Sequence, residues 1–201
     1  MTMRPWLTNI EFKQSARAPE MASDEVHIWR FSLEPADERD ALLLSQSILS
    51  NGERERAARF RFDSHRARFV ASHAALRRVL AQYVQIAPEQ IEYKFGAHGK
   101  PELANIINIH FNLSHSGAAG VLAVSRSGPV GIDIEQMAPI EHVSELVNRN
   151  FSKMERTAFM NISESLQLEA FYRCWTGKEA WIKLQGGGLA IPLDSFDVEI
   201  D

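Results

Sequence analysis

Apolar residues recur at helical spacing in the first third of the chain. The clearest case is residues 64–84, and two shorter helices are predicted before it, at 37–52 and 53–62. The apolar face of the helix at 64–84 consists of Phe69, Leu76, Leu80 and Tyr83. Ahead of these helices, residues 26–33 are rich in β-branched and aromatic side chains and predict a strand. This part of the chain therefore combines one strand with a group of helices.

The pattern changes after Pro88. Four short segments, separated by turn residues, then have the composition or the alternation of strands: 91–95, 107–113, 120–125 and 130–134. Because the connections between them are short, we expect consecutive strands to pair antiparallel.

The same order of elements then begins again. A helix is predicted over 166–185, and a glycine run that begins at Gly186 ends it. Residues 189–200 alternate and predict another strand. Helices followed by antiparallel strands, twice, predict an α+β fold of two similar lobes, each with helices packed on a small antiparallel sheet.

The expected domain division has three parts. A loosely ordered leader occupies residues 1–24, an N-terminal lobe residues 25–129 and a C-terminal lobe residues 130–201. The last alternating segment has no later strand to pair with, so two alternatives stay open: the C-terminal lobe is truncated, or it is naturally short.

Composition and charge exclude several classes of protein. The chain has 201 residues, of which 45% are hydrophobic and 24% charged, as in soluble globular proteins. A net charge of −4 gives no overall attraction to nucleic acid or to an anionic membrane. No apolar run approaches the roughly 20 residues of a membrane span, and Cys174 is the only cysteine. We therefore expect a cytoplasmic protein that binds neither nucleic acid nor membrane.

The sequence GIDIE at 131–135 places two carboxylates on one face of a predicted strand. Alternate side chains of a strand share a face, so Asp133 and Glu135 would lie about 7 Å apart. That spacing allows both to ligate one hard cation, and Gly131 would leave open space on the same face for a ligand. The alternative is the solvated outer face of an amphipathic strand.

A second group of charged residues lies on the helix at 166–185. Glu179 and Lys183 are four residues apart and hence adjacent on the helix surface. They flank an apolar stripe, where a half-buried Glu179 would complete the cation site begun by Asp133 and Glu135. The alternative is an ordinary surface ion pair.

The apolar stripe of this helix also limits where the ammonium of the neighbouring Lys178 can lie. The stripe consists of Phe171, Trp175 and Ile182. Lys178 lies close to it, so its ammonium needs either an exposed tip or an anionic partner.

Ser114 and His115 lie at the end of a predicted strand, before a turn, where ligand contacts are common. His115 would act as a donor to phosphate, and the alternative is a turn histidine bonded to backbone. A serine-hydrolase interpretation is weak because adjacent side chains of a strand point to opposite faces. The sequence also contains no G-x-S-x-G elbow.

Basic residues form the last group of candidates. Several of them suit the recognition of phosphate oxygens: Arg54, Arg56, Arg59, Arg61, Arg66, Arg68 and Lys100. The alternative is a solvated helix face, because Glu53 and Glu55 interleave with the arginines.

Three fragments, HFNLSHSG at 110–117, GIDIE at 131–135 and WTGKEAWIKLQGGGL at 175–189, together resemble the 4′-phosphopantetheinyl transferase superfamily. Their order and spacing are similar to the larger, two-lobed type represented by the surfactin synthetase activator, and the likeness covers about residues 25–201. The resemblance implies a monomer with its active site in the cleft between the lobes. It also implies an Mg²⁺-dependent transfer of the phosphopantetheine arm of coenzyme A to a serine of an apo acyl or peptidyl carrier protein.

The resemblance implies a role for each matching residue. Asp133, Glu135 and Glu179 would bind Mg²⁺ together with the pyrophosphate of coenzyme A. Lys183 would contact the phosphates and protonate the leaving 3′,5′-ADP. Glu179, or a water near it, would take the proton of the carrier serine. Four further residues would grip the phosphates of coenzyme A: Arg56, Lys100, Ser114 and His115.

The chain departs from the family at three places. Some relatives carry a lysine where Glu53 stands, and Arg56 replaces another lysine. Family members also continue for a few more strands beyond Asp201. The segment after GIDIE would meet the carrier protein through an apolar patch of Phe151, Met154 and Phe159, for which the alternative is core packing.

Two other functions use the same residues. The first is a catalytically inactive relative that binds coenzyme A or a carrier protein. The second is a metal-dependent phosphohydrolase, for which the sequence supplies no second metal cluster.

Overall fold

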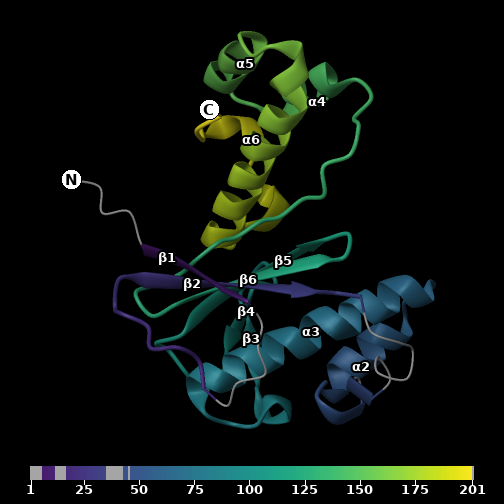
Figure 1. Ribbon diagram of the computed structural model, residues 1–201, viewed down its shortest axis with the longest axis vertical. Helices are drawn as coiled ribbons and strands as arrows, with labels where there is room; N and C mark the ends of the chain where they lie inside the picture. The colour runs from purple at the N-terminus through teal and green to yellow at the C-terminus, as the bar shows by residue number, and fades with distance from the viewer. Residues whose placement is uncertain (1–5, 12–16, 35–42, 45, 201) are drawn as a thin grey trace.

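The computed structural model describes residues 6–11, 17–34, 43–44 and 46–200. Figure 1 shows a sheet in the middle of the molecule, with α2 and α3 on one side and α4, α5 and α6 on the other. The sheet has the order β1-β2-β6-β5, in which β1 and β2 are parallel and the other pairs antiparallel. Its strands are β1 (Trp6–Glu11), β2 (Glu25–Ser32), β5 (His110–Ser116) and β6 (Ala119–Ser125).

The first lobe is built by packing α3 (Asp63–Val84) onto one face of this sheet. The predicted helix at 64–84 is confirmed, and its four predicted face residues are all buried. Leu76, Leu80 and Tyr83 pack with sheet residues such as Trp29, Phe111 and Leu122, whereas Phe69 belongs to a second cluster with Ala57 of α2. Buried apolar area of this kind is the main stabilising contribution. The remaining elements of the lobe are α2 (Asn51–Ala58), the 3-10 helix η1 (Pro88–Gln90), and the hairpin of β3 (Tyr93–Phe95) and β4 (Pro101–Leu103).

Two boundaries in the first lobe differ from the prediction. The helix predicted at 37–52 ends at Ser47 rather than at Asn51, and its residues 37–42 and 45 lie outside the described residues. Ser50 instead caps α2, because its side chain accepts from the backbone of Glu53 while the Glu53 carboxylate accepts from the backbone of Ser50. Within the segment interpreted as a leader, residues 6–11 form β1.

The second lobe has a separate core, formed by α4, α5, α6 and the segment between α4 and α5. Its buried residues include Val147, Phe151, Phe159, Phe171 and Cys174. The helix predicted at 166–185 is confirmed, and Gly186 ends it in the left-handed conformation at φ 68°. The elements are α4 (Val143–Asn150), α5 (Lys153–Met160), α6 (Glu164–Gln185) and the 3-10 helices η2 (Gly188–Ala190) and η3 (Leu193–Ser195).

The α+β class and the two lobes are confirmed, but two predicted strands are wrong. Residues 130–134 form no backbone ladder. The backbone N–H of Ile132, which a ladder would use, instead donates to the side-chain oxygen of Asn112 on β5. Residues 189–200 form two 3-10 turns and an unpaired end, and the described part of the second lobe contains no paired strand. Among the described helices, none is both long and apolar enough to cross a membrane.

Candidate active site

The two lobes meet where Lys183 of α6 reaches the end of β5. Its ammonium lies 2.5 Å from Oδ1 of Asp133 and donates to the hydroxyl oxygen of Ser114 at 2.9 Å. Ser114 in turn donates to the same Asp133 oxygen at 2.7 Å. The hydroxyl therefore donates once and accepts once, which matches its capacity. These three residues come from β5, from the GIDIE segment and from α6, and they join both lobes at one point.

The GIDIE segment is aligned along β5 by side chains. Asn112 accepts from the backbone N–H of Ile132 at 2.8 Å, and Ser116 donates to Oε2 of Glu135 at 2.7 Å. Asn112, Ser114 and Ser116 are alternate residues of β5, so they share a face and can contact the segment at regular intervals. Asp133 and Glu135 lie on this shared side, as the sequence predicts, although the segment is not a strand.

The prediction of open space at Gly131 is wrong. A Cβ atom there would lie 1.9 Å from the carbonyl oxygen of Ala180 and 2.5 Å from the backbone nitrogen of Leu184. Glycine is therefore required because α6 passes directly over this position, and no room for a ligand remains.

Glu179 is the third carboxylate of the predicted metal site. Burial raises the pKa of Glu179, and the negative charges of Asp133 and Glu135 add to the effect, while Lys183 opposes it. The alternative of an ordinary surface pair between Glu179 and Lys183 is not found, because the Lys183 ammonium pairs with Asp133. Oδ2 of Asp133 is buried and has no hydrogen-bond partner within the described residues.

These observations test whether the carboxylates suit a metal ion. An all-oxygen donor set, a raised carboxyl pKa and an unpartnered carboxylate oxygen all suit a hard divalent cation. Across the described part of the chain, no three His, Cys, Asp or Glu side chains are gathered closely enough to hold an ion by themselves. The residues fit Mg²⁺ in chemistry and charge.

Ser114 and His115 point to opposite faces of β5, as predicted, since Ser114 is buried and His115 is exposed. Partial desolvation lowers the pKa of His115, and the neighbouring His73 and Lys183 lower it further. Lys183 and Glu135 both act on this imidazole, so His115 lies near charges of both signs at the edge of the site.

A cavity of about 680 Å³ lies between α2, α3, the β3–β4 hairpin and β5. Arg56 lines it from α2 and His73 lines it from α3. Asn112 and Leu113 form its wall on β5, next to Ser114. The Arg56 guanidinium lies 5.2 Å from the ring centroid of Phe69, a cation–π distance. Of the predicted phosphate-binding residues, Arg56 lines this cavity, and Ser114 and His115 follow its wall residue Leu113 on β5 without lining it.

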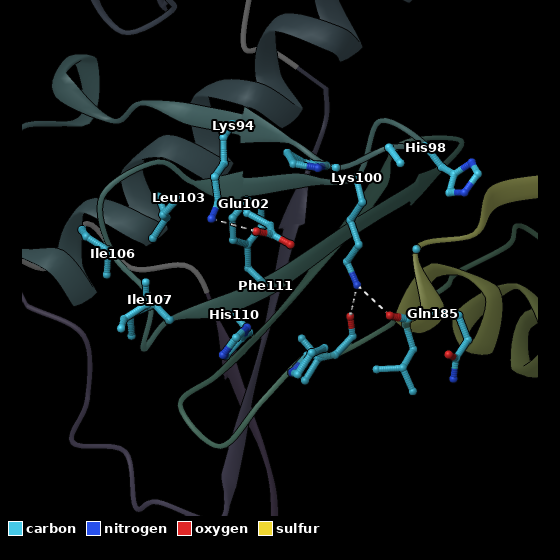
Figure 2. Close-up of a pocket in the computed structure, with 18 residues that line it drawn as sticks. Lys94, His98, Lys100, Glu102, Leu103, Ile106, Ile107, His110, Phe111 and Gln185 are labelled. Carbon is cyan, nitrogen blue, oxygen red and sulfur yellow. Dashed lines mark hydrogen bonds and ion pairs between the residues drawn. The ribbon is translucent and has the colours of Figure 1, made fainter.

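Lys100 lies elsewhere. It is in the turn between β3 and β4 and lines a second cavity of about 540 Å³. Figure 2 shows its side chain pointing toward the end of α6 near Gln185, where its hydrogen bonds are drawn as dashed lines. Burial lowers the pKa of this ammonium.

A charged network behind the first cavity was not predicted from the sequence. The Glu53 carboxylate accepts from Nε of Arg77 at 2.7 Å and lies 2.9 Å from Nδ1 of His73. Burial alone would raise the pKa of Glu53. Hydrogen bonds from His73 and Ser50 and the charge of Arg77 outweigh burial and bring the pKa to about 2. The sequence signal that could have pointed to a structural role for Glu53 is the Ser50-x-x-Glu53 capping box.

The three apolar residues after GIDIE divide into two kinds. Phe151 and Phe159 are buried in the core of the second lobe, so core packing is confirmed for them. Met154 is 68% exposed and borders a surface cavity of about 670 Å³ beside η3.

Comparison with known proteins adds an independent line of argument. Residues 129–201 match the family model described as "4′-phosphopantetheinyl transferase superfamily". Residues 34–127 match that described as "4′-phosphopantetheinyl transferase, N-terminal". Three curated relatives carry the name 4′-phosphopantetheinyl transferase: HetI of Nostoc sp., Sfp of Bacillus subtilis and AcpT of Escherichia coli.

The likeness to these relatives covers most of the chain. HetI is 35% identical over 174 residues, which are 85% of this chain and 72% of HetI. Sfp is 35% identical over 154 residues, which are 77% of this chain and 67% of Sfp. AcpT is 37% identical over 144 residues, which are 72% of this chain and 69% of AcpT.

Proposed function

Because the chain belongs to the 4′-phosphopantetheinyl transferase superfamily, we propose that it transfers the phosphopantetheine arm of coenzyme A to a carrier protein. The acceptor is a serine hydroxyl of an apo acyl or peptidyl carrier protein, and the second product is 3′,5′-ADP. The single observation that carries this proposal is the meeting of Lys183, Asp133 and Ser114 between the lobes, with Glu179 beside them.

The reaction exchanges one phosphoryl bond for another. The serine oxygen forms a bond to the phosphorus of the phosphopantetheine, and the bond from that phosphorus to the bridging oxygen of 3′,5′-ADP breaks. The serine proton passes to Glu179, directly or through a water. Burial and the charges of Asp133 and Glu135 raise the pKa of this carboxyl, which makes it a better general base.

Lys183 acts on the other side of the phosphorus. Its ammonium holds the phosphate oxygens and gives a proton to the leaving 3′,5′-ADP. The bonds from Lys183 to Ser114 and Asp133 support this role because they aim the ammonium at the junction between the lobes. The positive charge at this place also stabilises the negative charge that develops in the transfer.

The cavity of about 680 Å³ offers a place for the nucleotide end of coenzyme A. Arg56 on its wall suits a phosphate, since a guanidinium recognises phosphate oxygens in pairs. Ser114 and His115 lie at the neighbouring end of β5, between this cavity and Lys183. We assign Arg56, Ser114 and His115 to the binding of coenzyme A phosphates.

Asp133, Glu135 and Glu179 would hold Mg²⁺. The unpartnered Oδ2 of Asp133 and the all-oxygen character of the set support this assignment. When bound, the ion would neutralise charge on the attacked phosphoryl group.

The carrier protein, the cell compartment and the oligomeric state belong to the same proposal. Exposed Met154 is the remaining candidate of the predicted apolar patch for docking a carrier. The proposed monomer is supported by the contribution of both lobes of one chain to the site. The proposed cytoplasmic location is supported by the single, buried cysteine, which suits a reducing compartment.

The test is the intact mass of an apo carrier protein after incubation with this chain, coenzyme A and Mg²⁺, beside a chelated sample. The expected result is a metal-dependent gain of one phosphopantetheine arm. Asp133→Ala abolishes the gain while the far-UV circular dichroism stays unchanged, and the exposed control Asp24→Ala keeps full activity. Full activity in Asp133→Ala would refute the metal assignment. Thermal stabilisation by coenzyme A without any transfer would favour the inactive relative instead.

A further inference from the structure

The Lys100 ammonium is enclosed by three backbone carbonyls. Its nitrogen donates to the carbonyl oxygen of Val130 at 3.0 Å, of Lys183 at 2.6 Å and of Leu184 at 3.1 Å. A lysine ammonium has three N–H donors, so all of them are used. A phosphate oxygen could bind Lys100 only by displacing a carbonyl, which makes it a poor phosphate ligand in this arrangement.

The three carbonyls mark where Lys100 acts. Two of them belong to the last turn of α6, whose carbonyls have no partner inside the helix and carry its negative dipole end. The third belongs to the segment that leads into GIDIE. A single side chain of the first lobe therefore caps α6 and ties it to the start of the GIDIE segment.

The stem of Lys100 is also fitted to this place. A Cβ atom on Gly186, the residue that ends α6, would lie 3.4 Å from Cδ of Lys100. The stem of Lys100 thus passes within van der Waals distance of the residue that ends α6. Figure 2 shows the extended side chain crossing this gap.

Lys183 is consequently held at two points. Its carbonyl oxygen accepts from Lys100, and its own ammonium reaches Ser114 and Asp133. Displacing the last turn of α6 would move the backbone from which the Lys183 side chain extends. The position of the Lys183 ammonium thus depends on the hydrogen bond that Lys100 donates to the Lys183 backbone carbonyl.

We propose that Lys100 is a positioning residue: by capping the last turn of α6 it sets Lys183 against Ser114 and Asp133, and it does not grip coenzyme A. This inference rests on the proposed function. It replaces the phosphate-binding role that resemblance to the family implies for Lys100.

Steady-state kinetics with an apo carrier protein separate the two roles. Lys100→Met removes the cap, and we expect kcat to fall at least about tenfold while KM for coenzyme A changes less than about threefold, since misplacement acts on the chemical step. The matched control is Lys94→Met, because Lys94 lines the same cavity but is exposed and pairs only with Glu102. This control should keep the wild-type constants.

Two further arms identify a phosphate contact if there is one. With 3′-dephospho-coenzyme A, a positioning role gives the same fold-loss for Lys100→Met as with coenzyme A. The proposal would be overturned if Lys100→Met were as active as wild type with 3′-dephospho-coenzyme A, or if it raised KM tenfold with either substrate. Lys100→Arg sharpens the result, because arginine binds phosphate well but its planar fork does not fit three converging carbonyls. Positioning predicts that Lys100→Arg remains impaired, whereas a phosphate grip predicts recovery.

Amide hydrogen exchange of the substrate-free protein supplies a readout without activity. Lys100→Met should speed exchange about tenfold or more at residues 183–187 and leave the first half of α6 unchanged. Unchanged exchange at 183–187 would contradict the cap even if kcat falls. Should Lys100→Met fail to fold, the kinetics and the hydrogen exchange are both measured on Lys100→Arg. If wild-type protein transfers nothing, the proposed function fails while the exchange result still decides on the cap.

Discussion

Gly131 and Ala180 touch backbone to backbone at the junction of α6 with the GIDIE segment. A Cβ atom on Gly131 would lie 1.9 Å from the Ala180 carbonyl oxygen, well inside any allowed contact. The neighbouring nitrogen of Leu184 would be 2.5 Å away, so a sideways shift gives no relief. The packing of α6 against the GIDIE segment therefore depends on the absence of a side chain at position 131.

Gly131→Ala should lower the free energy of unfolding by about 3 kcal/mol or more, because backbone rather than a flexible side chain must move. Urea denaturation followed by circular dichroism measures the change. Gly52→Ala is the control, since nothing lies within 4 Å of a Cβ there and alanine favours the helix. A loss smaller than about 1 kcal/mol in Gly131→Ala would show that the junction yields easily.

Glu179→Gln should stabilise the metal-free protein near neutral pH. The pKa of Glu179 is raised by burial and by its acidic neighbours, so its ionised form opposes folding above that pKa. The stabilisation should disappear as the pH falls below 4.5, where the carboxyl is protonated in both the folded and the unfolded state. Thermal unfolding between pH 4 and pH 8 checks this sign.

The same variant should lose at least about 10²-fold in kcat, the usual contribution of a general base. A gain in stability together with a loss of turnover would identify Glu179 as a group kept for chemistry at the expense of the fold. Equal stability of the two proteins at pH 8 would argue that the carboxyl is not strained.

Lys178→Met should cost about 3–5 kcal/mol of folding free energy, because it strands a buried carboxylate. The Lys178 side chain has no exposed surface, and its ammonium lies 2.7 Å from Oε2 of Glu155. It also donates to the carbonyl oxygens of Leu193 and Phe196. Guanidinium chloride denaturation measures the loss. The exposed pair of Arg173 with Glu169 is the control, and Arg173→Ala should cost less than about 1 kcal/mol.

Glu53→Gln should destabilise the first lobe by about 2–3 kcal/mol at pH 7. The pKa of Glu53 in the folded protein is about 2, against 4.5 for an ordinary glutamate. Its contribution is therefore complete above pH 4.5 and is lost as the pH falls toward 2. The difference in unfolding free energy between variant and wild type should therefore be smaller at pH 3 than at pH 7. Glu55→Gln, on the exposed side of α2, should show no such change.

The sequence predicted the parts of this protein that depend on local patterns. The face of α3 and the glycine stop of α6 are both local, and both are confirmed. Of the two alternatives predicted for Lys178, an exposed tip or an anionic partner, the structure shows the partner, which is Glu155. Periodicity fixes such features because the residues involved lie within a few turns of each other.

The errors occur where distant segments decide the conformation. GIDIE alternates like a strand, yet the β5 side chains Asn112, Ser114 and Ser116 bind it in place of a ladder. Residues 189–200 alternate too, but the buried Lys178 binds two of their carbonyls. A phosphate-binding Lys100 and a helix-capping Lys100 look the same in the sequence. Only the contact of its ammonium with the last turn of α6 distinguishes the two roles.

Six of the seven residues 177–183 of α6 have a specific contact elsewhere in the protein, and the seventh, Ile182, is buried, so few substitutions in this stretch should be neutral. Its two lysines bind different parts of the protein, since Lys178 binds the carbonyls of Leu193 and Phe196 and Lys183 binds Ser114 of the first lobe. A saturation scan of 177–183 should therefore find few tolerated substitutions, unlike a scan around exposed Arg173. The contacts of this stretch are Gly177 to Val198, Lys178 to Glu155, Glu179 near Asp133, Ala180 to Gly131, Trp181 to Phe196, Ile182 in the interior and Lys183 to Ser114.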